Sequence, residues 1–204
     1  MYLVLGAGGH AKVIIDILKT TGNNEIIAFD DKKKGGKILG VDIVGAIEDA
    51  KGYIEENKII AGIGDNFLRE KIVKEIVGNY GIAIHSSAII GEEVSIGNGT
   101  VIMANAVINS GAHIGEHSIV NTGATIDHDC WIGDYVHISP GVHLGGNVRI
   151  EKLSWIGLGS NIKNNISIGE KVIVGAGSVV VNNLVEEGVY YGTPARIQTI
   201  ASNC

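Results

Sequence analysis

A six-residue period running from Ile84 to Val185 constrains the fold more than any other feature of this sequence. Every sixth residue is aliphatic over seventeen consecutive hexads without a shift in phase: Ile84, Ile90, Ile96, Ile102, Ile108, Ile114, Val120, Ile126, Ile132, Ile138, Leu144, Ile150, Ile156, Ile162, Ile168, Val174 and Val180. A mostly small residue, such as Ala106 or Ala124, follows four places later. A fixed period of this kind is typical of a solenoid, in which each turn covers the apolar face of the next.

Composition and charge exclude several other classes. The net charge is −6 and no basic stripe is present to collect phosphates, which argues against a nucleic-acid partner. The run Lys32–Lys34 lies among acidic residues and glycines and is interpreted as a solvated loop. No apolar run has the length of a membrane span. Cys130 and Cys204 are too few for a disulfide framework or a zinc site, and Cys130 falls on a small, inward position of the repeat. We therefore expect a cytoplasmic protein.

The first eighty residues follow a different pattern, that of a βαβ unit. An apolar strand at 2–5 leads into the turn Gly6-Ala7-Gly8-Gly9-His10-Ala11, and apolar residues then recur at helical spacing over 12–18. Such a turn places free backbone N–H groups at a helix N-terminus, where a phosphate can bind. A second strand at 25–29 ends in Asp30 and Asp31, which are well placed for a ribose or a base edge. A tight turn without a ligand remains the alternative.

The rest of this region predicts a short strand at 41–44, a helix at 48–56 and a third strand at 58–63. A second helix is expected over 68–77, with an apolar face formed by Leu68, Ile72, Val73, Ile76 and Val77. This is half of a dinucleotide-binding fold, sufficient for a mononucleotide but short for NAD. The predicted organisation is a Rossmann-like α/β domain over 1–81 and an all-β domain over 82–204 that includes a C-terminal closing segment.

Three hexads make one triangular coil of eighteen residues. The hexads resemble the left-handed parallel β-helix of the hexapeptide-repeat acyltransferases, and the left-handed sense is implied by that resemblance. The segment Tyr191-Gly192-Thr193-Pro194-Ala195-Arg196 resembles the Gly-x-Pro-Ala-Arg/Lys sequence that closes the helix in many members. With the Gly-Ala-Gly-Gly-His turn and Asp30-Asp31-Lys32, nearly the whole chain is similar to the bacterial nucleotide-amino-sugar N-acetyltransferases and the sialic acid O-acetyltransferase-like proteins. The resemblance implies acetyl-CoA as co-substrate and a homotrimer with its sites between subunits.

Histidine is the usual base for acetyl transfer because its pKa lies near the working pH. The seven histidines are His10, His85, His113, His117, His128, His137 and His143. His128 stands between Asp127 and Asp129, and the catalytic base of the family falls on it, with Asp129 assisting. The alternative is an exposed histidine among acids. His113 and His117 lie about one coil earlier, have no acidic partner and are expected to be solvated, and His143 is expected to be structural.

The remaining site residues come from the resemblance and from the eighteen-residue register. His137, expected at a coil corner, is assigned to acetyl-CoA, although a surface residue is nearly as consistent with the pattern. Gly146 lies one coil beyond His128, so its N–H is an oxyanion donor candidate. Leu158 and Ala176 are assigned to acetyl-CoA and Asn121 to the sugar. The residues expected to bind the nucleotide sugar are Gly8, Gly9, His10, Asp30, Asp31 and, on a neighbouring loop, Gly64.

The predicted function is acetyl transfer from acetyl-CoA to the amino group of a UDP- or GDP-linked amino-sugar, for bacterial surface glycan synthesis, with no metal required. A sugar O-acetyltransferase is the nearest alternative, since the same histidine serves an amine or a hydroxyl. A non-catalytic nucleotide-sugar-binding β-helix scaffold is another. A metal-dependent, carbonic-anhydrase-like use of the β-helix would need three convergent histidines between subunits, and the acid-flanked His128 favours transfer.

Overall fold

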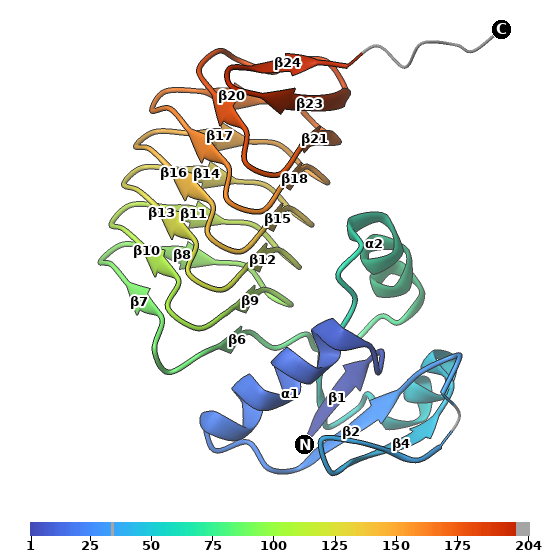
Figure 1. Ribbon diagram of the computed structural model, residues 1–204. Helices are drawn as coiled ribbons and strands as arrows, with labels where there is room; N and C mark the ends of the chain where they lie inside the picture. The colour runs from blue at the N-terminus through green and yellow to red at the C-terminus, as the bar shows by residue number, and fades with distance from the viewer. Residues whose placement is uncertain (34, 199–204) are drawn as a thin grey trace, which may run out of the picture.

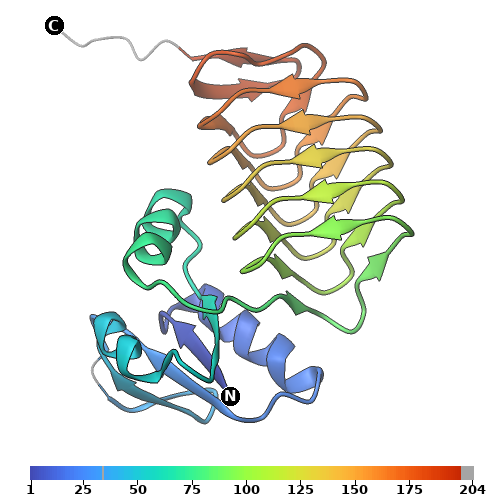
Figure 2. The same cartoon turned by 180° about the vertical axis from the view of Figure 1, so that it is seen from behind.

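The computed structural model describes residues 1–33 and 35–198, which form an α/β domain followed by a parallel β-helix (Figure 1). Its coils rise from the α/β domain toward the C-terminus, and the view from behind shows them stacked as closed triangular turns (Figure 2). The expected fold class, a Rossmann-like domain joined to a left-handed β-helix, is confirmed. The end of the closing segment, including Cys204, lies outside the described residues.

The α/β domain has a five-stranded sheet in the order β3-β4-β2-β1-β5, in which only the β3–β4 pair is antiparallel. Its strands are β1 (Tyr2–Leu5), β2 (Ile26–Phe29), β3 (Lys37–Ile38), β4 (Val41–Gly45) and β5 (Lys58–Ala61). The helix α1 (Gly9–Thr20) connects β1 to β2, and α2 (Asn66–Glu75) follows β5. The helix expected over 48–56 is a 3₁₀-helix, η1 (Ile47–Tyr53). The parallel strands β2 and β5 flank β1, so the turn after β1 opens at the carboxyl edge of the sheet.

The buried face of α2 differs from the expected one. Leu68 and Val77 are exposed, whereas Asn66, Arg69 and Ile72 are buried. The helix begins earlier than its apolar pattern indicated, because Asp65 caps it by accepting a hydrogen bond of 2.8 Å from the Leu68 N–H. Two polar side chains therefore occupy the interface where an apolar stripe was predicted.

Each hexad of the β-helix contributes a two- or three-residue strand to one of three parallel faces, and strands eighteen residues apart are paired. Face I contains β6 (Ala83–Ile84), β9 (Val101–Ile102), β12 (Ile119–Val120), β15 (His137–Ile138), β18 (Trp155–Ile156) and β21 (Val172–Val174), and β23 (Gly188–Gly192) and β24 (Ala195–Ile197) close it. Face II contains β7 (Ile89–Ile90), β10 (Val107–Ile108), β13 (Thr125–Ile126), β16 (His143–Leu144), β19 (Asn161–Ile162) and β22 (Val179–Val180). Face III contains β8 (Ser95–Ile96), β11 (His113–Ile114), β14 (Trp131–Ile132), β17 (Arg149–Ile150) and β20 (Ser167–Ile168).

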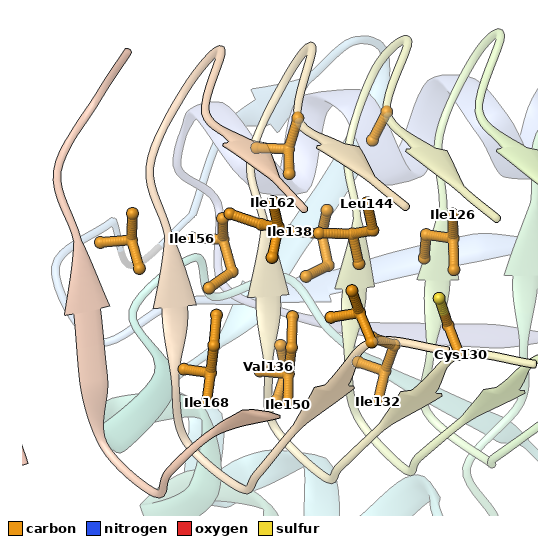
Figure 3. Packing of buried hydrophobic residues seen from close by; sticks show 14 of the residues in the cluster. Ile126, Cys130, Ile132, Val136, Ile138, Leu144, Ile150, Ile156, Ile162 and Ile168 are labelled. Carbon is orange, nitrogen blue, oxygen red and sulfur yellow. The ribbon is translucent and has the colours of Figure 1, made fainter. Parts of the chain in front are cut away.

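The aliphatic hexad residues fill the interior of the prism, where Figure 3 shows them interdigitating from all three faces. Cys130 packs among them and its Sγ lies 3.3 Å from the Gly145 carbonyl oxygen, as its inward position indicated. Burial of each isoleucine side chain stabilises the fold by roughly 1.5–3 kcal/mol. The coils are thus held by one continuous apolar column.

The corners between faces from residue 93 to residue 177 use left-handed backbone. Positive φ angles recur every six residues from Glu93 to Gly177, with values between 54° and 75°. Gly, Asn or Asp occupies ten of these fifteen places; of the other five, Glu93 lies on the II–III corner and four bulky residues lie on the III–I corner. The corner between faces III and I, which contains Gly99, His117, Tyr135, Leu153 and Lys171, is called here the docking corner because α2 packs against it.

The two domains share a buried core on face I. Residues of α1, including Ala11, Ile15 and Leu18, cluster with Val101 and Ile119 of the first coils. The N-terminal domain therefore covers the early strands of face I and leaves the later ones free.

Candidate active site

The first group of site residues lies at the carboxyl edge of the α/β sheet. Gly6 has a φ of +110°, a conformation that essentially only glycine adopts, and this lets the chain turn from β1 into α1. No side chain among the described residues caps the start of α1, so its first N–H groups face outward. They border a pocket of about 370 Å³, the glycine-turn pocket. Its lining includes Gly8, Gly9, His10, Asp30, Asp31 and Gly64, and so brings together six of the predicted substrate residues.

The two aspartates after β2, Asp30 and Asp31, have different hydrogen-bond partners and therefore different roles. Asp30 accepts three backbone hydrogen bonds, from Ala7 at 2.7 Å and from Lys32 and Lys33 at 2.9 and 2.8 Å. Although desolvation raises the pKa of Asp30, these N–H groups lower it by more, so the carboxylate stays ionised. Its role is to shape the turn. Asp31 uses one oxygen, Oδ1, to accept the Ile47 N–H at 2.9 Å, and Oδ2 has no partner among the described residues. That oxygen is available to a ligand.

The lysines after Asp31 were interpreted as a solvated loop, and Lys32 and Lys33 are indeed exposed in a loop, but both also lie beside the glycine turn. Lys32 lines the glycine-turn pocket, and the Nζ of Lys33 donates a hydrogen bond of 2.7 Å to the Ala7 carbonyl in the turn itself. Lys34 lies outside the described residues. Cations beside a turn of free N–H groups suit a diphosphate. Their position directly after the acidic pair was the signal that sequence reasoning set aside.

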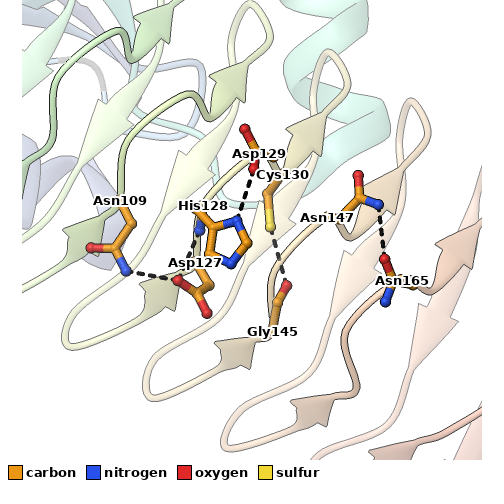
Figure 4. A network of polar contacts seen from close by, with 8 residues as sticks. All are labelled: Asn109, Asp127, His128, Asp129, Cys130, Gly145, Asn147 and Asn165. Atoms are coloured by element: carbon orange, nitrogen blue, oxygen red, sulfur yellow. Dashed lines mark hydrogen bonds and ion pairs between the residues drawn. The ribbon is translucent and has the colours of Figure 1, made fainter.

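His128 lies at the corner between faces II and III, after β13, and is largely exposed. Its Nδ1 is 2.8 Å from Oδ2 of Asp129 (Figure 4). The hydrogen bond to Asp129, followed by the charge of Asp127, raises the pKa of His128 above its ordinary value. Asp127 in turn accepts the His128 N–H and the side-chain amide of Asn109. The imidazole is therefore oriented by its Nδ1, which leaves Nε2 as the reactive nitrogen.

Gly146 is positioned against this free nitrogen, one coil beyond. A Cβ added at Gly146 would lie 2.6 Å from Nε2 of His128, so any larger residue would displace the imidazole from its present position. The Gly146 N–H donates to no backbone carbonyl of the described residues. The Gly145 N–H, by contrast, donates to the Ile162 carbonyl. Both residues line a pocket of about 510 Å³ with Lys163 and Asn164. A base and a free N–H donor thus border one cavity.

The predicted acetyl-CoA residues His137, Leu158 and Ala176 line a third pocket, of about 430 Å³, on face I. His137 was expected at a coil corner, but it lies in β15, because the residue before each aliphatic position belongs to the strand. Its ring stacks on Trp155 with centroids 5.9 Å apart. Asn121, predicted to contact the sugar, lies beside this pocket and directs its Nδ2 to the His137 Nε2 at 3.0 Å.

His137 also connects this face I pocket to the glycine-turn pocket. The ring of His10 lies 6.4 Å from that of His137, centroid to centroid. Burial, and then the proximity of His137, lowers the pKa of His10 to about 3. Burial, and then Arg69, lowers the pKa of His137 to about 4. His10 Nε2 and His137 Nδ1 are both buried without a hydrogen-bond partner among the described residues. Two neutral imidazoles therefore stand where the two pockets meet.

One chain does not bring all of these residues together. The corner that carries His128 joins faces II and III, so it lies across the prism from face I, where the α/β domain packs. The pocket at His128 shares no lining residue with either of the other two. Gly146 accompanies His128, and the other predicted ligand-binding residues lie on the opposite side.

The remaining histidines have structural contacts. His117 was expected to be solvated but is 5% exposed, because α2 and the residues after it cover the docking corner, and Tyr80 and Tyr135 pack against its ring. Burial lowers its pKa to about 4. His113 is half-buried and stacks on Trp131, and His143 is hydrogen-bonded to Thr125 at 2.8 Å. Within residues 1–33 and 35–198, no three His, Cys, Asp or Glu side chains gather as metal ligands do.

Two families match this sequence. Residues 2–76 match the PglD N-terminal domain, and residues 93–128 and 111–146 match the bacterial transferase hexapeptide (six repeats). The acetyltransferase domain of PglB from Neisseria gonorrhoeae, in complex with acetyl coenzyme A, is 35% identical, with a TM-score of 0.93 over 97% of this chain and 98% of that one. The chain belongs to the hexapeptide-repeat nucleotide-amino-sugar acetyltransferases. The predicted family and enzyme class are confirmed.

Two further relatives narrow the group. PerB from Caulobacter crescentus, in complex with CoA and GDP-perosamine, is 33% identical, with a TM-score of 0.89 over 97% of each chain. A UDP-N-acetylbacillosamine N-acetyltransferase of Bacillus subtilis is 36% identical over 104 residues, which are 48% of this chain and 48% of the relative. The chain spans about half or less of the length of the curated relatives it matches. No helix among the described residues is both long and apolar enough to cross a membrane.

Proposed function

We propose that this protein transfers the acetyl group of acetyl-CoA to the amino group of a nucleotide-linked amino-sugar, with His128 as the general base. The observation that carries the proposal is the pair formed by His128 and Asp129, whose free Nε2 lies under Gly146. The acetyl coenzyme A bound to the Neisseria domain, and the CoA and GDP-perosamine bound to PerB, support the choice of both substrates.

The chemistry follows from this geometry. The sugar amine attacks the carbonyl carbon of the thioester while Nε2 of His128 accepts a proton from the nitrogen. The new C–N bond forms, the C–S bond breaks, and CoA leaves as a thiolate that takes up the proton. The Gly146 N–H donates a hydrogen bond to the oxyanion of the tetrahedral intermediate. Asp129 holds Nδ1–H and stabilises the imidazolium.

The two domains divide the binding work. We assign residues 1–81 to the nucleotide sugar and residues 82–204 to acetyl transfer. Gly8, Gly9 and His10 would hold the diphosphate with Lys32 and Lys33, while Asp31 would face the nucleoside. His137, Leu158 and Ala176 would hold the pantetheine arm along face I. Asn121 would act through His137, which it orients.

A second copy of the chain is required to complete this site. His128 lies across the prism from the glycine-turn and face I pockets of its own chain. A closed cyclic assembly could bring the II–III corner of one subunit against face I of the next. We therefore propose a homotrimer, as the family resemblance implied, with each site formed by His128 of one subunit and both pockets of its neighbour.

The test is a transfer assay with purified protein, acetyl-CoA and a panel of UDP- and GDP-linked 4-amino-sugars, with thiol release as the readout. Free sialic acid is included as a hydroxyl acceptor. We expect release with one nucleotide amino-sugar and a loss of at least about a hundredfold in kcat for His128→Ala. His143→Ala, which changes an exposed histidine on face II, is the matched control and should retain activity.

Release with sialic acid alone would replace the amine by a hydroxyl acceptor. Equal rates for the wild type and His128→Ala would exclude His128 as the base. Nucleotide-sugar and CoA binding without any transfer would indicate a non-catalytic scaffold.

A further inference from the structure

Arg69 is the largest side chain that the described residues bury completely, with 1% of its surface exposed. It stands on α2 and is no part of the glycine-turn, His128 or face I pockets. A buried guanidinium is costly unless every donor is satisfied, and it usually faces a carboxylate. All five of its hydrogen bonds instead go to uncharged oxygen atoms.

Two of these five bonds go to backbone carbonyls of the β-helix. Arg69 Nε donates to the His117 carbonyl at 2.8 Å and Nη2 donates to the Tyr135 carbonyl at 3.0 Å. Asn66 extends the series, since its Nδ2 donates to the Leu153 carbonyl at 3.2 Å. The three acceptors are eighteen residues apart and all lie on the docking corner. One turn of α2 is therefore fixed to three successive coils.

The other arm holds the loop that follows β5. Nη1 donates to the carbonyls of Ile63 and Gly64 at 3.0 and 3.1 Å. These two residues form a wall of the glycine-turn pocket. The Gly64 backbone also lies close enough to His137 to oppose the fall in its pKa. A single planar group thus connects the wall of one pocket to the coils that carry the other.

We propose that Arg69 is a positioning residue for transfer, which holds the 63–64 loop at a fixed place over His137 so that the nucleotide-sugar and acetyl-CoA pockets stay aligned. The two ligands are those of the proposed function, on which this role rests. The planar fork matters more than the charge, because five donors in fixed directions are needed to reach four backbone carbonyls and the Asn66 side chain. Lysine has one nitrogen and cannot replace it.

The experiment compares Arg69→Lys and Arg69→Met with Lys152→Met. Lys152 forms an ion pair of 2.7 Å with Glu70, so it also joins α2 to the docking corner, but it does not touch the 63–64 loop. Both Arg69 variants should fold and assemble. Their KM for the nucleotide sugar should rise at least about tenfold, with a fall in kcat, because misplacement by about 1 Å can cost a hundredfold in rate. Their KM for acetyl-CoA should change less than about twofold, and Lys152→Met should change neither constant.

Binding measured by calorimetry with UDP, GDP and CoA separates this role from the proposed function. If the wild type transfers no acetyl group, the proposed function fails, while weaker nucleotide binding with unchanged CoA binding in the Arg69 variants still supports the positioning role. Three results would overturn the positioning role of Arg69. These are a KM and Kd for the nucleotide ligand equal to those of the wild type, equal losses of affinity for the nucleotide and for CoA, or insolubility of both Arg69 variants beside a soluble Lys152→Met. Each of these would make Arg69 a folding residue only.

Discussion

The His128–Asp129 pair depends on where the backbone places each partner. Asp129 occupies a corner and has a φ of 59°, a left-handed conformation that Asp tolerates better than most residues. Its carboxylate thereby reaches the ring of the preceding residue rather than pointing along the strand. A local turn of two adjacent residues thus supplies the orientation that serine hydrolases build from distant segments.

The pH profile should report this pair. A base must be neutral to accept a proton, and Asp129 raises the pKa of His128, so wild-type activity should rise with pH through that raised pKa. Asp129→Asn removes the charge and lowers the His128 pKa, which moves the acidic limb of kcat/KM to lower pH. The plateau should fall by about 10- to 100-fold because the ring loses its orientation. Asp127→Asn should shift the limb less, and an acidic limb that does not move in Asp129→Asn would contradict the assignment.

The absence of a side chain at Gly146 leads to a prediction about how added bulk there affects stability and activity. Its backbone is not left-handed, and Asn164 carries a side chain at the same place one coil later, so alanine should be compatible with the fold. The new Cβ would crowd Nε2 of His128. We expect Gly146→Ala to keep the melting temperature of the wild type and to lose about 10- to 100-fold in kcat. Gly52→Ala, where a Cβ meets nothing within 4 Å, is the control for activity.

The β-helix is set by its corners as much as by its aliphatic column. A non-glycine residue with positive φ costs about 1–2 kcal/mol, and asparagine or aspartate rather less. On two of the corners glycine, asparagine and aspartate hold every place except that of Glu93, whereas the docking corner contains His117, Tyr135 and Leu153. These three side chains are buried under α2, and their carbonyls accept its hydrogen bonds. Docking of the α/β domain therefore offsets the strain.

Glu93 provides a test of corner strain without that compensation. It is exposed, has a φ of 59° and makes no side-chain hydrogen bond or ion pair with the described residues. Glu93→Gly should raise the free energy of unfolding by about 0.5–1 kcal/mol, and Glu93→Val should lower it. Denaturant unfolding at a fixed protein concentration measures both. Glu92→Gly, at the neighbouring exposed place with ordinary φ, should destabilise, and the same sign at both positions would contradict the explanation.

At the scale of the molecule, the glycine-turn and face I pockets lie away from the base at the II–III corner, so the proposed site needs a second subunit. Complementation measures this directly. His10→Ala and His128→Ala variants should each be inactive as homotrimers, because each lacks one half of every site. Mixed and reassembled, about a quarter of the sites would combine an intact His128 with an intact His10 from the neighbour.

Recovery of roughly that fraction of wild-type activity is the expected result, with the mass of the assembly checked by light scattering. A mixture as inactive as its parents, despite exchange of subunits, would contradict the proposed site shared between neighbouring subunits.

Repeats of eighteen residues are local and periodic, so the β-helix followed from the sequence alone. Every coil packs on its neighbours, and the aliphatic position, the small inward position and the eighteen-residue register of His128 and Gly146 could each be read from spacing. The glycine turn and its aspartates were also local. The family and the acetyltransferase class followed from these motifs.

The arrangement between the domains depended on contacts between segments far apart in the chain. Arg69 and Asn66 on an amphipathic helix resemble solvated residues until the carbonyls of His117, Tyr135 and Leu153 are placed against them. The same docking buries His117, which spacing had assigned to solvent. Backbone carbonyls carry no signature in the sequence, because every residue has one. Only the tertiary structure decided which of them meet a side chain, and so where the two pockets lie relative to each other.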